Sequence, residues 1–206
     1  MADLKNEWLG LTAKYTEDKS IQADFWSEIE QAYSQPNRHY HNLGHLDYMM
    51  QKVDEYDAQI QQIDCVKFAV FYHDFIYSAT SKNNEDRSAE TAGEKCQKLG
   101  LSEQHIAKCQ THILATKSHA FNKDMDTNYL IDIDLGIIGE SLEMYEDYAK
   151  KIRQEYIIFP DFLYKPGRKK VLEHFLHMDS IYKTPEFQKA FESQARKNLR
   201  WELDNL

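Results

Sequence analysis

The sequence has little of the two residues that most often interrupt helices. Its 206 residues include only seven glycines and four prolines, whereas tyrosine and phenylalanine are plentiful. It also lacks any long low-complexity stretch. Disordered chains and small β-sandwiches are usually richer in turn-forming residues, so this composition favours a compact helical protein. At this length the simplest organisation is one domain with a sizeable core. We therefore expect an all-α fold.

Cysteine is scarce as well, with three residues in the whole chain and no Cys-x-x-Cys pair. An odd number of unpaired cysteines is typical of reduced, structural thiols in a reducing compartment. The first ten residues contain three charged side chains and no apolar core, so we do not expect a signal peptide in them. No apolar run approaches the ~20 residues of a membrane span. We expect a cytoplasmic protein without a membrane partner.

Positive charge is in the minority, with 25 Lys and Arg residues against 34 Asp and Glu residues and a formal net charge of −9. Such a balance does not favour a surface that binds duplex nucleic acid. A small anionic substrate held by a few local Lys and Arg side chains remains compatible with it. The sequence leaves open whether the protein is a monomer or a homodimer.

What the chain does have is an apolar segment with two polar residues inside it. Residues 70–77 read Val-Phe-Tyr-His-Asp-Phe-Ile-Tyr, at the end of a run whose apolar spacing from Ile63 suits a helix. Burying the imidazole of His73 and the carboxylate of Asp74 is costly unless each is paired or bound to a metal. Both groups are ligands for divalent ions. The segment therefore indicates either a hydrogen-bonded pair within a helix or part of a metal site.

Two other stretches carry residues of the same kinds. Residues 38–45 contain three histidines, of which His41 and His45 are four apart and can share one helix face. Asp132 and Asp134 interrupt the strongly apolar stretch 127–138, which we expect to be a buried helix, and an acid there should be paired, capped or ligated. A mixed site of imidazoles and carboxylates suits manganese, iron, cobalt, zinc or magnesium, and does not choose among them.

Helical periodicity and capping signals organise the rest of the chain. Ser20 and Ser102 are the expected N-caps of two helices, Pro185 is expected at the first helical position of the last one, and residues 160–167 are expected to form a turn. The predicted helices lie at about residues 4–15, 20–35, 42–56, 63–77, 85–99, 102–116, 127–138, 141–158, 168–177 and 185–203.

Taken together, these stretches resemble the HD superfamily of metal-dependent phosphohydrolases, which is named for its ordered His, His-Asp and Asp residues. Within it, the chain is most similar to a small branch of predicted metal-dependent HD phosphohydrolases, over roughly residues 38–200. The resemblance is carried by Tyr-His-Asn-Leu-Gly-His (40–45), Phe-Tyr-His-Asp (71–74), Glu-Asp-Arg-Ser-Ala-Glu (85–90), Ile-Leu-Ala-Thr-Lys-Ser-His (113–119), Ile-Asp-Ile-Asp-Leu (131–135) and Lys-Pro-Gly-Arg (165–168).

The resemblance implies a single-domain HD-type helical bundle over residues 1–206 with a metal site in its core. Residues 1–34 would pack N-terminal helices on it, 38–138 would form the metal-binding core, and 141–206 would add C-terminal helices. The implied cofactor is one or two divalent ions. The implied ligands are His45, His73, Asp74 and Asp134, with Asp134 preferred over Asp132.

The implied activity is hydrolysis of a phosphate ester or anhydride, of a nucleotide or a related small molecule, by metal-activated water. Asp74 could also bridge a second ion. The stretch 40–45 is also similar to a motif of cyclic-nucleotide phosphodiesterases, in which the first histidine protonates the leaving oxygen, and that role would fall to His41. The chain departs from that motif at Asp47, which follows His45 by two residues instead of three, so the cyclic-nucleotide substrate is not implied.

Four further residues are candidates for contacting a phosphorylated substrate: Lys117, His119, Arg168 and Arg87. His119 could instead be an exposed loop histidine, and Arg87 could form an ordinary surface pair with Glu90. Two other functions compete with the hydrolase. An HD-type di-iron oxygenase would require additional histidine ligands between the His-Asp pair and the last Asp. A non-catalytic sensor of metal or nucleotide would not require an intact ligand set.

Overall fold

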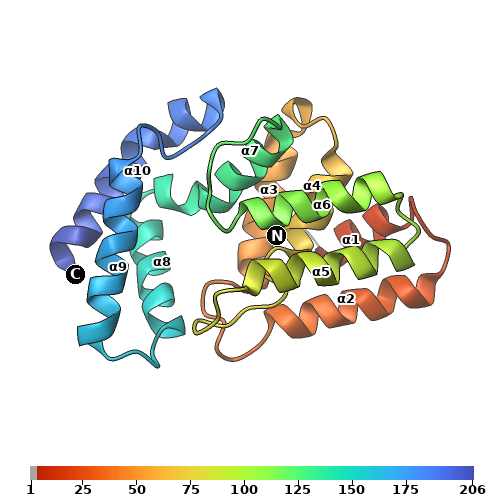
Figure 1. The fold of residues 1–206 in the computed structure, drawn as a ribbon, viewed down its shortest axis with the longest axis horizontal. Coiled ribbons are helices and arrows are strands. Elements are labelled where there is room, and N and C mark those ends of the chain that lie inside the picture. Colours follow the sequence, from red (N-terminus) through yellow and green to blue (C-terminus); the bar gives the residue numbers. More distant parts are fainter. Residues whose placement is uncertain (1–3) are drawn as a thin grey trace. The chain divides into compact units, whose positions relative to one another are not determined.

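The computed structural model describes residues 4–206, and over this range it contains ten α-helices, two short 3₁₀ helices and no strand (Figure 1). The predicted all-α class is confirmed. The chain divides into two compact units, one ending at Leu130 and the other covering Ile131–Leu206. The single HD domain stays a prediction. Within residues 4–206 no helix combines the length and apolar character that crossing a membrane requires.

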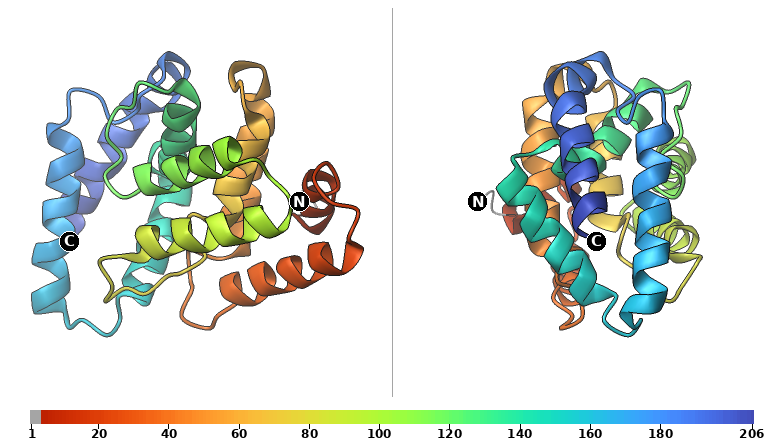
Figure 2. Two further views of the ribbon diagram at one scale, coloured as in Figure 1. Left: turned by 45° about the vertical axis from the view of Figure 1, so that its right-hand side comes forward. Right: turned by 90° about the vertical axis from the view of Figure 1, so that its left-hand side faces the viewer.

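The first unit contains six complete helices, a 3₁₀ helix and the start of a seventh helix. Their bounds are α1 Leu4–Thr12, α2 Lys19–Tyr33, α3 Leu43–Glu55, η1 Asp57–Gln59, α4 Ile63–Tyr72, α5 Asn84–Lys98, α6 Glu103–Ala115 and α7 Met125–Asp134, with the division inside α7. The second unit continues with η2 Leu135–Gly139, α8 Leu142–Glu155, α9 Asp161–His177 and α10 Pro185–Asn205. Figure 2 shows the helices of each unit from two further sides.

Helix α4 is the central element of the first unit, because α3, α5 and α6 all pack against it. Seven of its ten residues are buried, which explains why its sequence is mostly apolar, and the charged Asp64 and Lys67 are only partly buried. Helix α1 covers it through Trp8, whose ring makes edge contacts with Phe68 and Phe71 at centroid distances of 5.9 and 5.2 Å. The consequence for function is that the residues at the C-terminal end of α4 lie next to the core.

Several predicted helix boundaries are confirmed and several are wrong. Ser102 caps α6 by accepting from the backbone N–H of His105, and Pro185 is the first residue of α10. The cap of α2 is Asp18 and not Ser20, because the Asp18 carboxylate accepts from two backbone N–H groups of the first turn.

The expected turn at residues 160–167 is also wrong. Helix α9 begins at Asp161 and contains Pro166, in its second turn. Helix 63–77 ends at Tyr72, so His73 and Asp74 follow the helix and do not lie inside it. The helix predicted at 127–138 is α7, which continues beyond Asp134 as the 3₁₀ helix η2.

In the second unit, η2 packs closely on α10. A Cβ atom at Gly139 would lie 2.5 Å from the Cβ of Phe191 and 2.7 Å from the hydroxyl oxygen of Tyr182, so only glycine fits there. Asn198 of α10 donates its side-chain amide to the carbonyls of Ile138 and Glu140, both at 2.8 Å. These contacts satisfy carbonyl groups at the end of η2 that have no hydrogen-bond partner within the helix.

Candidate metal centre

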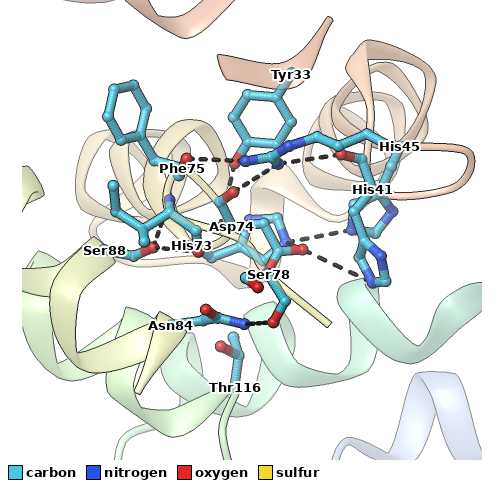
Figure 3. Close-up of polar contacts among 12 residues, drawn as sticks. Tyr33, His41, His45, His73, Asp74, Phe75, Ser78, Asn84, Ser88 and Thr116 are labelled. Carbon is cyan, nitrogen blue, oxygen red and sulfur yellow. Dashed lines mark hydrogen bonds and ion pairs between the residues drawn. The ribbon is translucent and has the colours of Figure 1, made fainter. Parts of the chain in front are cut away.

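Three predicted ligands converge in the first unit: His45, His73 and Asp74 (Figure 3). One donor atom from each lies within 4.8 Å of the others. The two histidine Nε2 atoms are 3.2 Å apart, and the Oδ2 atom of Asp74 lies 3.1 Å from Nε2 of His73. Both imidazoles are buried, with side-chain exposure of 1% for His73, and Asp74 is 16% exposed. The group thus presents two nitrogens and one oxygen to a common point.

The hydrogen bond on the far side of the His73 ring decides which nitrogen is available. Nδ1 of His73 lies 2.9 Å from the carbonyl oxygen of Val70. A carbonyl can only accept, so Nδ1 carries a hydrogen, and Nε2, which faces Asp74 and His45, is the ring nitrogen that could bind a metal. Metal-binding histidines usually make such a bond through their other nitrogen. The donor set therefore fits a divalent cation.

The start of α3 positions His45. Asn42 is the N-cap, and its Oδ1 atom accepts from the N–H of Gly44 at 2.8 Å while its amide donates to the carbonyl of His39 at 2.8 Å. This arrangement fixes the path of the loop that precedes the helix. His45 then falls in the first turn of α3 and is 3% exposed. The sequence Asn-Leu-Gly-His forms this local structure because asparagine is a strong N-cap residue.

The end of α4 positions the other two ligands. The N–H of His73 donates to the carbonyl of Ala69 at 2.8 Å, so this residue still follows the helical path. The N–H of Asp74 donates to the hydroxyl of Tyr33, at the end of α2, at 3.2 Å (Figure 3). Two residues later the N–H of Ile76 donates to the Ser88 hydroxyl of α5 at 3.0 Å. The segment leaving α4 is thus tied to two other helices.

His41 lies beside this group. Its Nε2 atom is 3.9 Å from Oδ2 of Asp74, and its side chain is 20% exposed (Figure 3). Its ring faces that of Tyr77 with a centroid distance of 4.5 Å. His41 is therefore close to the cluster but more accessible than His45 and His73, as a residue that exchanges protons with a substrate must be.

Arg38 is a residue of this region to which the sequence analysis gave no role. It is 5% exposed, and its guanidinium donates to three carbonyl oxygens: those of His41, Asp74 and Phe75, at 3.1, 2.7 and 2.9 Å. It also lies over the rings of Tyr33 and Tyr77, at 4.7 and 5.3 Å. A sequence signal was available, since the arginine stands directly before the histidine-rich stretch, but it does not reveal the three acceptors.

The structure separates the roles of the two acids in α7. Both carboxylate oxygens of Asp132 accept hydrogen bonds at the start of α10, from the N–H groups of Lys183 and Thr184 and from the Thr184 hydroxyl, at 2.7–3.0 Å. Asp132 is thus engaged as a cap within the second unit. Asp134, the last residue of α7, is only partly buried. Its assignment as the fourth ligand stays a prediction.

The four predicted substrate-binding residues have different surroundings. Lys117 forms an exposed ion pair with Asp86 at 2.5 Å, and Arg87 is exposed on α5. His119 adopts a positive φ of 50°, which marks a turn after α6. Arg168 is buried and makes a two-pronged pair with Glu202, at 2.7 and 2.8 Å, so a phosphate contact would require it to leave that carboxylate.

His112 is a second buried histidine of the first unit. It is fully buried on α6, and its Nδ1 atom lies 2.9 Å from the Thr127 hydroxyl. Burial lowers the pKa of His112 to about 4, so the ring is neutral near pH 7. Among residues 4–206, the only group of three or more His, Cys, Asp or Glu side chains placed to share an ion is the one at His45, and His112 is not in it.

No family model matches the chain, and no curated protein or solved structure shows significant similarity to it. The interpretation of the site therefore depends on its own geometry.

Proposed function

We propose that the protein is a metal-dependent phosphohydrolase of the HD type, which cleaves a phosphate ester or anhydride of a nucleotide or a related small molecule. The observation that carries this proposal is the convergence of His45, His73 and Asp74, three ligand-type side chains from two separate helix ends, within 4.8 Å. Burying imidazole and carboxylate groups together is costly unless each is paired or bound to a metal.

His45 and His73 would hold the ion through nitrogen, and Asp74 through oxygen. A bound divalent ion supplies positive charge that polarises a phosphoryl oxygen and makes a water molecule a better nucleophile. Mixed nitrogen and oxygen ligands are compatible with manganese, cobalt, iron, zinc or magnesium. Asp134 is the proposed fourth ligand.

His41 has the proposed role of general acid. Its ring packs on Tyr77 and its side chain is 20% exposed, so a leaving-group oxygen could approach it from solvent. Histidine is suited to proton transfer near neutral pH, which contributes typically 10²- to 10⁴-fold to a rate. The nearby Asp74 carboxylate, at 3.9 Å, would attract the protonated ring and hold it in place.

The test is phosphate release from a panel of nucleotides and an aryl phosphate, with Mn²⁺, Co²⁺ or Mg²⁺. Asp74→Ala should reduce metal-dependent release by at least about 10³-fold, since it removes a ligand next to the reacting centre. The matched control is Asp147→Ala, because Asp147 is an exposed acid of α8 that pairs only with Lys151 in the second unit. It should leave release unchanged.

The metal content of the purified protein completes this test. Protein that binds one or two ions per chain but releases phosphate from no substrate would contradict the hydrolase. Oxygen consumption by the iron-bound protein would support the oxygenase. Binding of a nucleotide without turnover would support the sensor.

A further inference from the structure

The strongest unassigned feature of the described residues is the contact set of Arg38. A buried guanidinium usually pairs with a carboxylate, but Arg38 directs two of its nitrogens at backbone carbonyls. Those carbonyls belong to two segments that are far apart in sequence. One is the loop of His41, and the other is the turn of Asp74 and Phe75 that follows α4.

The three acceptors include the backbone of both residues proposed to act in catalysis. Nη1 of Arg38 is shared between the carbonyls of His41 and Asp74, at 3.1 and 2.7 Å, and Nη2 reaches the carbonyl of Phe75 at 2.9 Å. A planar guanidinium holds its donors in a fixed fork, so acceptors bound to one nitrogen are held at a fixed separation. The same residue therefore sets the distance between the His41 loop and the Asp74 turn.

Two tyrosines complete the arrangement. The Arg38 guanidinium lies over Tyr77, and Tyr77 also supports the His41 ring. Tyr33, which the guanidinium also contacts, accepts from the N–H of Asp74. We call Arg38 with its three carbonyls and these two rings the Arg38 clamp. Its members contact both His41 and Asp74, whereas no Arg38 hydrogen bond reaches the imidazoles of His45 or His73.

We propose that Arg38 is a positioning residue that holds the His41 ring against Asp74, and so sets proton transfer without taking part in metal binding. This inference rests on the proposed function for its kinetic consequence, but the placement of His41 can be measured without turnover. Lysine cannot replace Arg38, because a single ammonium cannot span the three carbonyls in the same fork.

The test compares Arg38→Lys with a matched control, Arg153→Lys. Arg153 makes similar contacts in the second unit: it donates to the carbonyls of Tyr156 and Phe159 and lies 4.6 Å from the Tyr164 ring centroid, and it also pairs with the Asp161 carboxylate at 2.8 Å. Both substitutions therefore remove an arginine that binds carbonyls and stacks on tyrosine. Only the first one is expected to affect His41.

The first readout is the His41 ring signal in NMR spectra of histidine-labelled protein. The ring lies 4.5 Å from Tyr77, so its chemical shift depends on ring-current effects and moves when its orientation changes. Arg38→Lys should move the His41 signal, and Arg153→Lys should not. A His41 signal that stays in place in folded Arg38→Lys protein would overturn the proposal, whether or not a substrate has been found.

The second readout separates chemistry from binding. With an aryl phosphate, Arg38→Lys should lower kcat by about 10²-fold, as expected for a misplaced catalytic group, while KM and the affinity for Co²⁺ change by less than about threefold. An equal loss of Co²⁺ affinity would contradict a positioning role. Absence of turnover in the wild type would refute the proposed function and leave the NMR result to decide about Arg38.

A milder variant covers the case in which Arg38→Lys does not fold. Tyr33→Phe removes only the hydroxyl that accepts from Asp74 and keeps the ring under Arg38. It should move the His41 signal in the same direction and lower kcat by a smaller factor. No movement of that signal in folded Tyr33→Phe protein would count against the clamp.

Discussion

The two units of the chain treat buried charge in different ways. In the second unit, Glu202 is 6% exposed and receives two bonds from Arg168 and one from the Tyr145 hydroxyl at 2.5 Å. In the second unit, therefore, the buried Glu202 carboxylate is neutralised by the Arg168 guanidinium. In the first unit, His45, His73 and Asp74 converge, and the buried arginine beside them points at backbone carbonyls.

This difference distinguishes a buried ion pair that is complete within the protein from a group of side chains of metal-ligand type. A carboxylate that already has an arginine and a hydroxyl gains nothing further from a cation. Two imidazoles and a carboxylate that converge on one point are of the types that ligate divalent ions, which is the basis of the proposed metal site. Arg168 belongs to the stretch 165–168 that carries the family resemblance. In the structure its guanidinium pairs with Glu202, and this pair stabilises the second unit.

The largest effect expected from this comparison is on the stability of the second unit. Glu202→Gln leaves the buried Arg168 guanidinium without its carboxylate, so unfolding in urea should cost about 3–5 kcal/mol less. Mn²⁺ binding by the folded variant should remain unchanged, because Glu202 is not a ligand of the proposed centre.

The double variant Arg168→Met with Glu202→Leu is the control. It removes both charges together and should recover most of the lost stability, since well-packed apolar residues often replace a buried ion pair without loss. If the double variant were as unstable as Glu202→Gln, the ion pair itself would not be the source of the effect.

A second contrast concerns two buried titratable groups, one in each unit. His112 is neutral in the folded state because burial lowers its pKa from 6.5 to about 4. Asp132 resists ionisation because burial raises its pKa from 3.8 to about 6, although the Thr184 and Lys183 bonds oppose the shift. The two groups therefore change stability in opposite directions between pH 4 and 6.

The His112 effect is expected to be the larger of the two. Below pH 6.5 the unfolded chain binds a proton at this residue that the folded chain refuses, so stability is lost as the pH falls. From pH 7 to pH 4.5, wild type should lose about 2–3 kcal/mol relative to His112→Gln. Urea unfolding of both proteins measures this difference, and parallel pH profiles would show that burial does not suppress protonation of His112.

The Asp132 effect has the opposite sign. Between pH 3.8 and about 6 the folded chain holds a proton that the unfolded chain releases, so its stabilising contribution is present at low pH and is lost as the pH rises. From pH 4.5 to pH 7, wild type should lose roughly 2 kcal/mol relative to Asp132→Asn. If wild type gained stability over that interval instead, the three donors would be stronger than the desolvation of the carboxylate.

Much of the helical architecture could be predicted from the sequence because its signals are local. The Ser102 cap, the Asn42 region and Pro185 all act through contacts within one helical turn. The wrong predictions arise where a competing local signal, or packing against a neighbouring helix, determines the helix boundary. Asp18 replaces Ser20 as a cap, and α9 tolerates Pro166 although proline predicted a turn. A helix that packs on a neighbour can compensate for one missing backbone hydrogen bond.

The proposed metal ligands could be selected from the sequence, but their supporting residues could not. His45, His73 and Asp74 stand out because buried imidazoles and acids are costly without a partner. Arg38 and Tyr33 do not stand out, since their importance depends on carbonyl and N–H groups that any sequence has. Asp132 and Asp134 are two residues apart, and only the hydrogen bonds at the start of α10 identify Asp132 as a cap.

The sequence by itself determined the helical class and the identity of the candidate ligands, because both follow from residue type and short-range spacing. Only the tertiary structure decided which donors meet, which acid already accepts several hydrogen bonds and which arginine joins the loop of His41 to the turn of Asp74. Those outcomes depend on contacts between segments 28 to 52 residues apart, such as His45 with His73 and Asp132 with Thr184. Such contacts form only when the whole core packs, because no local signal encodes the distance between two helix ends.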